Sequence, residues 1–216
     1  MSRKKQRRFA ELEHLPNALD SSMLSAGGNW VRNLFKNDSP VVLELGCGKG
    51  EYTLALARVY RDTNVIGVDR KGDRIWKGAK RALEEPLSNV AFLRARIEHL
   101  GDYFDSGQVQ EIWMPYPDPL PKRRQAKHRV LSLPFLETYR RILVKGGIVH
   151  VKTDDAGLIE YVIETLSEYG RAIVKRVSHD LYAEEPDDEL LRIETTYERR
   201  HLDVGRTIKY ISFGFS

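Results

Sequence analysis

Residues 41–50 constrain the fold of this chain more than any other stretch. The first five are mostly apolar, and the segment ends in three glycines at alternate positions, Gly46, Gly48 and Gly50. A helical pattern follows directly over residues 51–57. Glycine permits a sharp turn and lets ligand atoms approach the backbone closely. A helix start offers unpaired N–H groups. The segment therefore predicts a buried strand, a turn and a helix N-terminus that together suit a nucleotide-like ligand.

The spacing of these glycines narrows the class of ligand. The pattern is G-x-G-x-G, which differs from the G-x-G-x-x-G of dinucleotide sites and from the phosphate loop with its terminal Lys-Ser/Thr. Glu44 lies two residues before Gly46, where a carboxylate would repel a pyrophosphate. It would suit a ligand with positive charge, such as the amino group of a methionine moiety. An ordinary tight turn between a strand and a helix is the alternative interpretation.

Strand-like and helix-like segments alternate along the rest of the chain. We expect strands over 41–45, 65–69, 90–93, 111–114, 148–151, 171–177 and 207–215. Helices are expected over 29–36, 50–60, 71–84, 97–104 and 155–168, with another from an N-cap at Ser132 through Leu143. The last two strands have no clear helix between them, so the final one is expected to be antiparallel. This order predicts an α/β, Rossmann-like fold with a mostly parallel seven-stranded sheet and helices on both faces. Ligands of such sheets bind at the carboxyl ends of the strands, near the switch point.

Length and composition fit one domain in a reducing compartment. The chain has 216 residues, of which 41% are hydrophobic, and no apolar run approaches the roughly 20 residues that span a bilayer. The basic N-terminus has no apolar segment behind it, so no secretory signal is predicted. Cys47 is the single cysteine and cannot form an internal disulfide, which is compatible with a cytoplasmic location. We expect residues 1–8 to form a basic flexible arm and 9–216 to form one domain.

The positive charge is concentrated in two short runs. Residues 3–8 and residues 122–129 hold five Lys or Arg each, and neither run contains an acid. The formal net charge is +4, so subtracting these ten charges leaves −6 for the remainder. Two such patches beside a cofactor-type fold favour a nucleic acid as partner. The alternative is two solvated runs that promote solubility.

Two aspartates follow predicted strands. Asp69 lies 19 residues after Gly50, where an acid can accept hydrogen bonds from both ribose hydroxyls of an adenosine or, alternatively, cap a helix. Asp118 lies in a loop with prolines at 115, 117, 119 and 121. Each proline fixes its own φ and restricts the preceding residue. The loop is therefore stiff and holds the Asp118 carboxylate in place next to Lys122.

Other candidates carry weaker signals. Thr153 or Asp154 is either a site residue or an N-cap of the following helix. Tyr197 is either a buried anchor or a base-stacking residue. A nucleophilic Cys47 is disfavoured, because the turn geometry alone favours a small residue there. The six histidines show no metal-binding spacing, so no metal is predicted.

Several of these motifs resemble one known family. Residues 44–50 resemble motif I of the class I S-adenosylmethionine-dependent methyltransferases. Residues 117–124, Thr153-Asp154 and residues 195–198 are similar to the tRNA (guanine-N7-)-methyltransferases of the TrmB type, and the likeness runs from about residue 7 to the end. The resemblance implies methyl transfer from S-adenosylmethionine to guanine N7 at position 46 of the tRNA variable loop. We predict no membrane association and no obligatory protein partner.

The resemblance also implies roles for single residues. The cofactor would contact Glu44, Gly46, Gly48, Gly50, Asp69, Arg96 and Asp118. Asp118 would also be the catalytic residue, lying between cofactor and target base. The tRNA would contact Lys122, Arg124, Asp154, Thr195, Thr196, Tyr197 and Glu198.

Three positions depart from the pattern. Leu120 stands where the family often has Trp, and Gln125 where it often has His. Arg96 stands where an acid usually faces the adenine, and arginine cannot accept a hydrogen bond from the adenine amino group. Arg96 could instead stack on the ring, which would leave the amino group to the backbone or to Glu98. This departure keeps open an RNA-binding protein with a methyltransferase fold and altered or lost activity. A methyltransferase acting on another substrate and a nicotinamide dehydrogenase are less favoured rivals.

Overall fold

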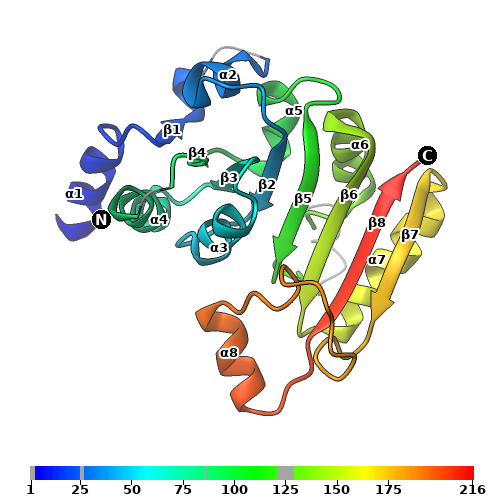
Figure 1. The fold of residues 1–216 in the computed structure, drawn as a ribbon. Helices are drawn as coiled ribbons and strands as arrows, with labels where there is room; N and C mark the ends of the chain where they lie inside the picture. Colours follow the sequence, from blue (N-terminus) through cyan, green and yellow to red (C-terminus); the bar gives the residue numbers. More distant parts are fainter. Residues whose placement is uncertain (1–2, 25–26, 86, 121–128) are drawn as a thin grey trace.

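The sheet is built outward from strand β2 (Val41–Leu45), all five residues of which are buried. Helices cover both faces of the sheet (Figure 1), so β2 has no solvent side and needs a continuous apolar run. It pairs in parallel with β3 (Asn64–Asp69) on one side and β5 (Val109–Pro115) on the other. The computed structural model describes residues 3–24, 27–85, 87–120 and 129–216.

The described residues form eight strands in the order β1-β4-β3-β2-β5-β6-β8-β7. The remaining strands are β1 (Ala18–Asp20), β4 (Val90–Arg94), β6 (Leu143–Thr153), β7 (Ala172–Ser178) and β8 (Lys209–Phe215). Strand β8 runs antiparallel to both β6 and β7, as the late antiparallel strand was expected to do. The expected number of seven strands is corrected by β1, which pairs with β4 at the edge. Its three residues are too few to show a strand pattern in the sequence.

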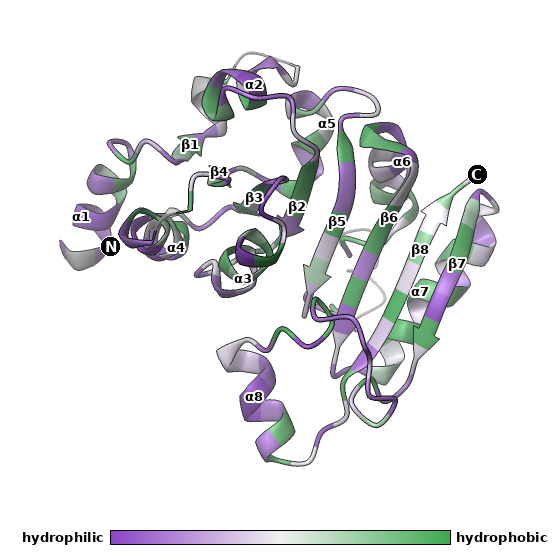
Figure 2. Ribbon diagram, viewed as in Figure 1, coloured by the Kyte–Doolittle hydropathy of each residue, from purple (hydrophilic) through white to green (hydrophobic). Residues whose placement is uncertain are grey.

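Two apolar clusters fill the two sides of the sheet. One packs α2 (Asn29–Phe35), α5 (Leu100–Tyr103), α6 (Leu133–Ile142) and α7 (Ala156–Tyr169) against the strands, with η2 (Ile97–His99) leading into α5. The other packs α1 (Arg3–Leu12), α3 (Glu51–Val59) and α4 (Gly72–Glu84). Figure 2 shows hydrophobic residues along the central strands and a mostly hydrophilic α8 (Thr196–Asp203). A short η1 (Ser21–Met23) follows β1. In the part of the chain that the structure describes, no helix is long and apolar enough to cross a membrane.

The N-terminal segment differs from the expected flexible arm over residues 1–8. Residues 3–8 belong to α1, which packs on α4. A Cβ added to Gly72 would lie 2.8 Å from the Phe9 ring and 3.0 Å from Leu12, so the two helices are in close contact. The Arg8 guanidinium lies 4.8 Å from the centre of the Trp76 ring. These partners are distant in sequence, so the charged run alone gave no sign of a helix.

Candidate active site

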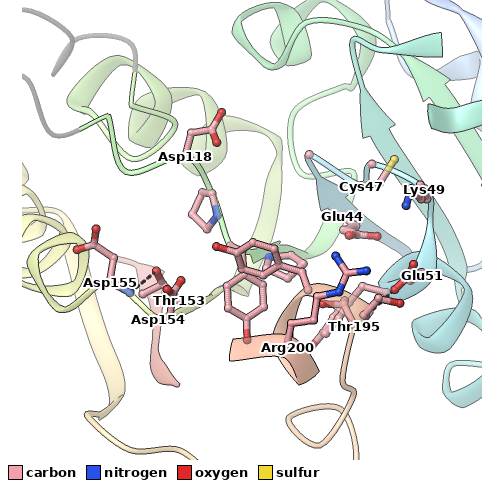
Figure 3. A pocket seen from close by; sticks show the side chains of 18 of the residues that line it. Glu44, Cys47, Lys49, Glu51, Asp118, Thr153, Asp154, Asp155, Thr195 and Arg200 are labelled. Atoms are coloured by element: carbon pink, nitrogen blue, oxygen red, sulfur yellow. Dashed lines mark hydrogen bonds between the residues drawn. The ribbon is translucent and has the colours of Figure 1, made fainter. Parts of the chain in front are cut away.

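A cavity of about 730 Å³ opens where the strand order reverses, at the carboxyl ends of β2 and β5. Strands β3 and β4 lie on one side of β2, and β5 and β6 lie on the other, which makes this the switch point of the sheet. The turn after β2, the loop after β5, the end of β6 and helix α8 form its walls (Figure 3). The cavity therefore lies where the sequence predicted a ligand.

The glycine turn is held in shape by the neighbouring strand. Gly46 has a φ of +78° and Gly48 a φ of +55°, which other residues rarely adopt. The Gly46 and Cys47 N–H groups both donate to the Val68 carbonyl, at 2.8 and 3.1 Å. The Gly48 N–H donates to Asp69 Oδ2 at 3.0 Å. A Cβ on Gly46 would meet nothing within 4 Å, so this side of the turn is open to a ligand.

Gly50 has a different role from the one expected. Its φ of +75° is also left-handed, but a Cβ there would lie 2.6 Å from the Phe92 ring and 3.0 Å from the Gly78 Cα. Gly50 does not line the cavity. Its small size lets α3 begin in contact with α4 and β4, so the structure explains this glycine by packing.

Glu44 is a buried carboxyl group in the cavity wall. It is 3% exposed and accepts a hydrogen bond from the Thr53 hydroxyl. Burial raises the pKa of Glu44 to about 7, although the Thr53 hydrogen bond opposes the rise. A positive ligand group beside it would favour the ionised form. The environment therefore fits the ammonium group that the sequence suggested.

The two residues expected near adenosine, Asp69 and Arg96, do not line this cavity. Asp69 is buried, and its second oxygen accepts a hydrogen bond from the Lys71 N–H at 2.8 Å. It lies at the end of β3 beside the glycine turn, and each of its oxygens keeps a lone pair for a ribose hydroxyl. The Arg96 guanidinium is 3.2 Å from Glu98 Oε1 on the exposed surface after β4.

Asp118 lies exposed in the proline-rich loop that follows β5. Figure 3 shows it at the far side of the cavity from Glu51 and Thr195. Its neighbours Tyr116 and Leu120 have φ values of +55° and +43°, so the loop stores backbone strain. Within the described residues, no hydrogen bond or ion pair engages the Asp118 carboxylate. That carboxylate is therefore available to a ligand.

The second basic run is described only at Arg129. Lys122, Arg124 and the rest of 121–128 lie outside the described residues. Arg129 donates to the Leu120 carbonyl at 3.2 Å and lies 4.0 Å from the centre of the Tyr161 ring. This side chain is thus partly engaged in holding the end of the proline-rich loop.

Helix α8 supplies the wall opposite Asp118. Thr195 is its N-cap, and its hydroxyl accepts a hydrogen bond from the Glu198 N–H at 3.1 Å. The Thr196 N–H donates to Glu51 Oε2 at 2.7 Å, which ties α8 to the start of α3. Burial alone would raise the pKa of Glu51, but the Thr196 hydrogen bonds and the charges of Lys49 and Arg81 together hold this pKa below its usual value. Tyr197 is 47% exposed and lines the cavity, so the buried-anchor interpretation is wrong.

Glu198 does not fit the role that the resemblance gave it. Its side chain is completely buried, it does not line the cavity, and one oxygen lies 2.7 Å from the Lys152 ammonium. A direct contact with RNA is incompatible with this geometry. The motif residue is instead an internal counter-ion, because a buried carboxylate needs a positive partner.

Asp154 is part of a charged cluster at the cavity edge. It lies 2.6 Å from Arg206 and 2.9 Å from the His201 ring. Burial would raise the pKa of Asp154, but the Arg206 hydrogen bond and the charges of both partners lower it. The N-cap of α7 is Asp155, which accepts a hydrogen bond from Leu158 N–H at 2.9 Å. The N-cap interpretation was therefore misplaced by one residue, and the Asp154 side chain remains at the site.

Comparisons with known proteins agree with this geometry. Residues 38–211 match a family model described as "Putative methyltransferase". The tRNA (guanine-N(7)-)-methyltransferase of Christiangramia forsetii is 44% identical over 98% of this chain and 98% of its own length. The enzyme of the same name from Bacteroides fragilis is 42% identical over 99% of this chain and 86% of its own. The chain belongs to the tRNA (guanine-N(7)-)-methyltransferase family.

Solved structures place the fold of this family member in a wider group. The 16S rRNA methyltransferase KamB aligns with a TM-score of 0.64 at 18% identity, covering 86% of this chain and 92% of its own. The 16S rRNA (adenine(1408)-N(1))-methyltransferase from Catenulisporales acidiphilia, solved with the cosubstrate SAM, aligns with a TM-score of 0.58 at 16% identity, covering 87% and 90%. At this identity the likeness shows only the fold, which is that of the class I S-adenosylmethionine-dependent methyltransferases.

Several cavity residues of this family member were not predicted from the sequence. Among the described residues, four cations line it: Lys49, Arg74, Arg200 and Arg206. Arg200 extends from α8 toward the glycine-turn side of the cavity (Figure 3). Helix α8 is polar and was not among the expected helices, although Thr195-x-x-Glu198 is a capping-box pattern that could have revealed it. Burial raises the pKa of the Cys47 thiol well above its usual value, which argues against a nucleophilic thiolate. Among the described residues, no group of three or more His, Cys, Asp or Glu could hold a metal.

Proposed function

We propose that this chain transfers the methyl group of S-adenosylmethionine to N7 of guanine in tRNA, at position 46 of the variable loop. The observation that carries the proposal is that one cavity joins the glycine turn after β2 to the Asp118 loop after β5. These segments are about 70 residues apart in the sequence and carry the two parts of the family resemblance. The identity to tRNA (guanine-N(7)-)-methyltransferases over nearly the whole chain supports the choice of substrate.

The glycine-turn wall is the proposed cofactor side. Gly46 and Gly48 leave the backbone open, and Glu44 suits the ammonium group of the methionine moiety. Asp69 would accept hydrogen bonds from the ribose. S-adenosylmethionine supplies an electrophilic methyl group on a sulfonium when bound. The protein's task on this side is to orient that group toward the opposite wall.

Asp118 is the proposed catalytic residue. Guanine N7 has an in-plane lone pair and no proton, so it can attack the methyl group in line without a strong base. The product is cationic. An aspartate held by prolines beside the target ring would position the base and stabilise the developing positive charge. The target base must leave its tertiary stack to reach this cavity.

The tRNA would lie across the open side of the cavity. Arg74 and Arg200 are exposed cavity residues that suit phosphate groups, together with Lys122 and Arg124 from the basic run. Tyr197 offers an exposed ring for stacking, and Asp154, Thr195 and Thr196 lie on the same wall. We expect the reaction to occur in the cytoplasm and to need no protein partner.

An alternative function is favoured by one observation. Arg96 replaces the expected acid, and its guanidinium pairs with Glu98 at the surface. A protein with this change could bind RNA without methylating it. Calorimetry with S-adenosylmethionine and S-adenosylhomocysteine separates the two functions, because absence of binding at millimolar concentration would contradict the methyltransferase proposal.

The decisive experiment is labelled methyl transfer from S-adenosylmethionine to unmodified tRNA by the purified chain alone. Chemical cleavage at N7-methylguanosine then locates the product. We expect one cleavage, at position 46. A tRNA with adenine at that position is the matched control and should take up no label. Label at another guanine would refute the position, and no label in any tRNA would refute the activity.

A further inference from the structure

A buried ion pair lies behind the α8 wall of the cavity. Lys152 on β6 is 1% exposed, and its ammonium group lies 2.7 Å from Glu198 Oε1. The same ammonium donates to the carbonyls of Leu191 and Ile193, each at 3.0 Å. All three of its protons are therefore engaged. Lys152 belongs to none of the motifs that the sequence indicated.

In the described part of the chain, only one oxygen of the Glu198 carboxylate accepts a hydrogen bond of ordinary geometry. Glu198 Oε1 also accepts a hydrogen bond from the Tyr182 hydroxyl at 2.7 Å. Its other oxygen, Oε2, is buried without a hydrogen bond of ordinary geometry, and so is the Tyr116 hydroxyl. Burial and the nearby Glu198 charge raise the pKa of Tyr116, so this hydroxyl keeps its proton. The Tyr116 hydroxyl and the Glu198 carboxylate therefore interact behind the cavity wall.

The two aromatic rings beside this cluster belong to the cavity. Tyr116 and Tyr197 both line it, and their ring centres lie 4.8 Å apart. Tyr116 has a φ of +55°, a strained conformation that the surroundings must hold. Tyr116 lies two residues before Asp118, and Tyr197 directly precedes Glu198. The ion pair joins β6 to α8, and the Tyr116 N–H donates to the Lys152 carbonyl at 2.8 Å, so the loop that carries Asp118 is attached to the same cluster.

We propose that Lys152 and Glu198 are positioning residues that hold Tyr116 and Tyr197 as an aromatic wall for the target base within reach of Asp118. The proposal rests on the proposed function and deepens it. It explains why the glutamate of the Thr195–Glu198 motif points into the protein and away from the RNA side. The pair acts through the two tyrosines and does not itself contact the substrate.

The test compares Glu198→Gln and Lys152→Met in the full chain with the unchanged protein. We expect kcat for tRNA methylation to fall about 10- to 100-fold, because small misplacement of reacting groups has effects of that size. The KM for tRNA and the Kd for S-adenosylhomocysteine should stay unchanged, because phosphate contacts and the glycine turn are intact. An unchanged kcat in either variant would overturn the proposal.

A matched control separates positioning from general stability. Glu111→Gln makes the same substitution in a partly buried polar cluster, where Glu111 accepts hydrogen bonds from Tyr60 and Trp113 away from the cavity. It should lower the melting temperature and leave kcat unchanged. The double variant Lys152→Met/Glu198→Leu removes both buried charges and should regain melting temperature while kcat stays low. The positioning role is refuted if kcat follows melting temperature across all four variants.

A structural readout keeps this proposal separate from the proposed function. Crystal structures of Glu198→Gln and of the unchanged protein measure the Tyr116–Tyr197 ring separation directly. We expect the separation to increase in the variant, and an unchanged separation would overturn the pair's role. If the unchanged protein methylates no tRNA, the proposed function fails, while the ring separation still tests the positioning pair.

Discussion

The two walls of the cavity are built in different ways. On the glycine-turn wall the backbone forms the surface, and its N–H groups are fixed by the Val68 carbonyl and Asp69 of the adjacent strand. On the α8 wall exposed side chains such as Tyr197 and Arg200 form the surface, and Asp118 faces this wall from the loop after β5. Behind that wall lies the Lys152–Glu198 pair, which joins β6 to α8.

The two walls are therefore stabilised by different kinds of contact. The turn depends on contacts between strands that are neighbours in the sheet, so it forms together with the core. The α8 wall depends on an ion pair and a strained loop that join distant parts of the chain. We therefore expect changes in the first wall to alter stability and cofactor binding, and changes in the second to alter either turnover or tRNA binding.

The largest effect is expected from Asp118→Ala, in the loop that faces α8 across the cavity. Loss of the carboxylate that positions the base and stabilises its charge should lower kcat by roughly 10²- to 10³-fold. Affinity for tRNA should change far less, as measured by filter binding. Asp118→Asn is the control that keeps the shape of the side chain and removes the charge, and it should also be slow. Equal activity of Asp118→Ala and the unchanged protein would contradict the assignment.

The next effect is a pH dependence on the glycine-turn side. The pKa of Glu44 in the folded protein, about 7, lies above the ordinary value of 4.5. Protonated Glu44 therefore stabilises the fold fully below pH 4.5, and this stabilisation is lost as the pH rises through about 7. The free energy of unfolding should fall by about 3 kcal/mol over this range. Urea unfolding of the ligand-free protein should show this loss relative to Glu44→Gln, which lacks the titration.

The same titration predicts proton release on cofactor binding. A cationic ligand favours the Glu44 carboxylate, so binding of S-adenosylhomocysteine below pH 7 should release a proton. Calorimetry in buffers of different ionisation enthalpy measures it. Proton uptake, or equal pH dependence of unfolding in Glu44→Gln and the unchanged protein, would contradict the role of Glu44.

A smaller effect distinguishes two glycines of the same turn. Gly46→Ala and Gly50→Ala introduce similar backbone strain, since both φ values are close to +75°. Only Gly50→Ala also forces a Cβ into Phe92 and Gly78, which should cost about 1–3 kcal/mol more in free energy of unfolding. Gly46→Ala should instead weaken S-adenosylhomocysteine binding. Equal unfolding free energies for the two variants would show that Gly50 is not a packing residue.

The smallest effect concerns the salt dependence of tRNA binding. If four or five phosphate contacts form, log affinity should fall with log salt with a slope of roughly −3 to −4. Arg200→Gln should reduce the magnitude of the slope by about 0.7–0.9. Arg199→Gln is the matched control, because Arg199 is on the same helix, does not line the cavity and lies near Glu194. A nearly flat slope in the unchanged protein would contradict a polyanion partner.

Much of the sheet could be predicted because its strands are buried on both faces. Such strands are short, mostly apolar runs that end at turn residues, and β2, β3 and residues 112–114 of β5 follow this pattern. Strand β1 and helix α8 could not be found in this way. Three residues carry no periodicity, and α8 buries only Glu198, so neither leaves an apolar pattern.

The glycine turn after β2, the stiff Asp118 loop and the position of both at the ends of strands could be predicted from the sequence alone. Local residue types set these features, because glycine widens and proline narrows the range of backbone conformations at its own position. The tertiary structure decided which side chains meet. Glu198, which was expected to contact RNA, forms a buried ion pair with Lys152, and Gly50, which was expected to contact the cofactor, packs against Phe92 and Gly78. Burial and pairing depend on residues that are distant in the chain, so no local pattern could reveal them.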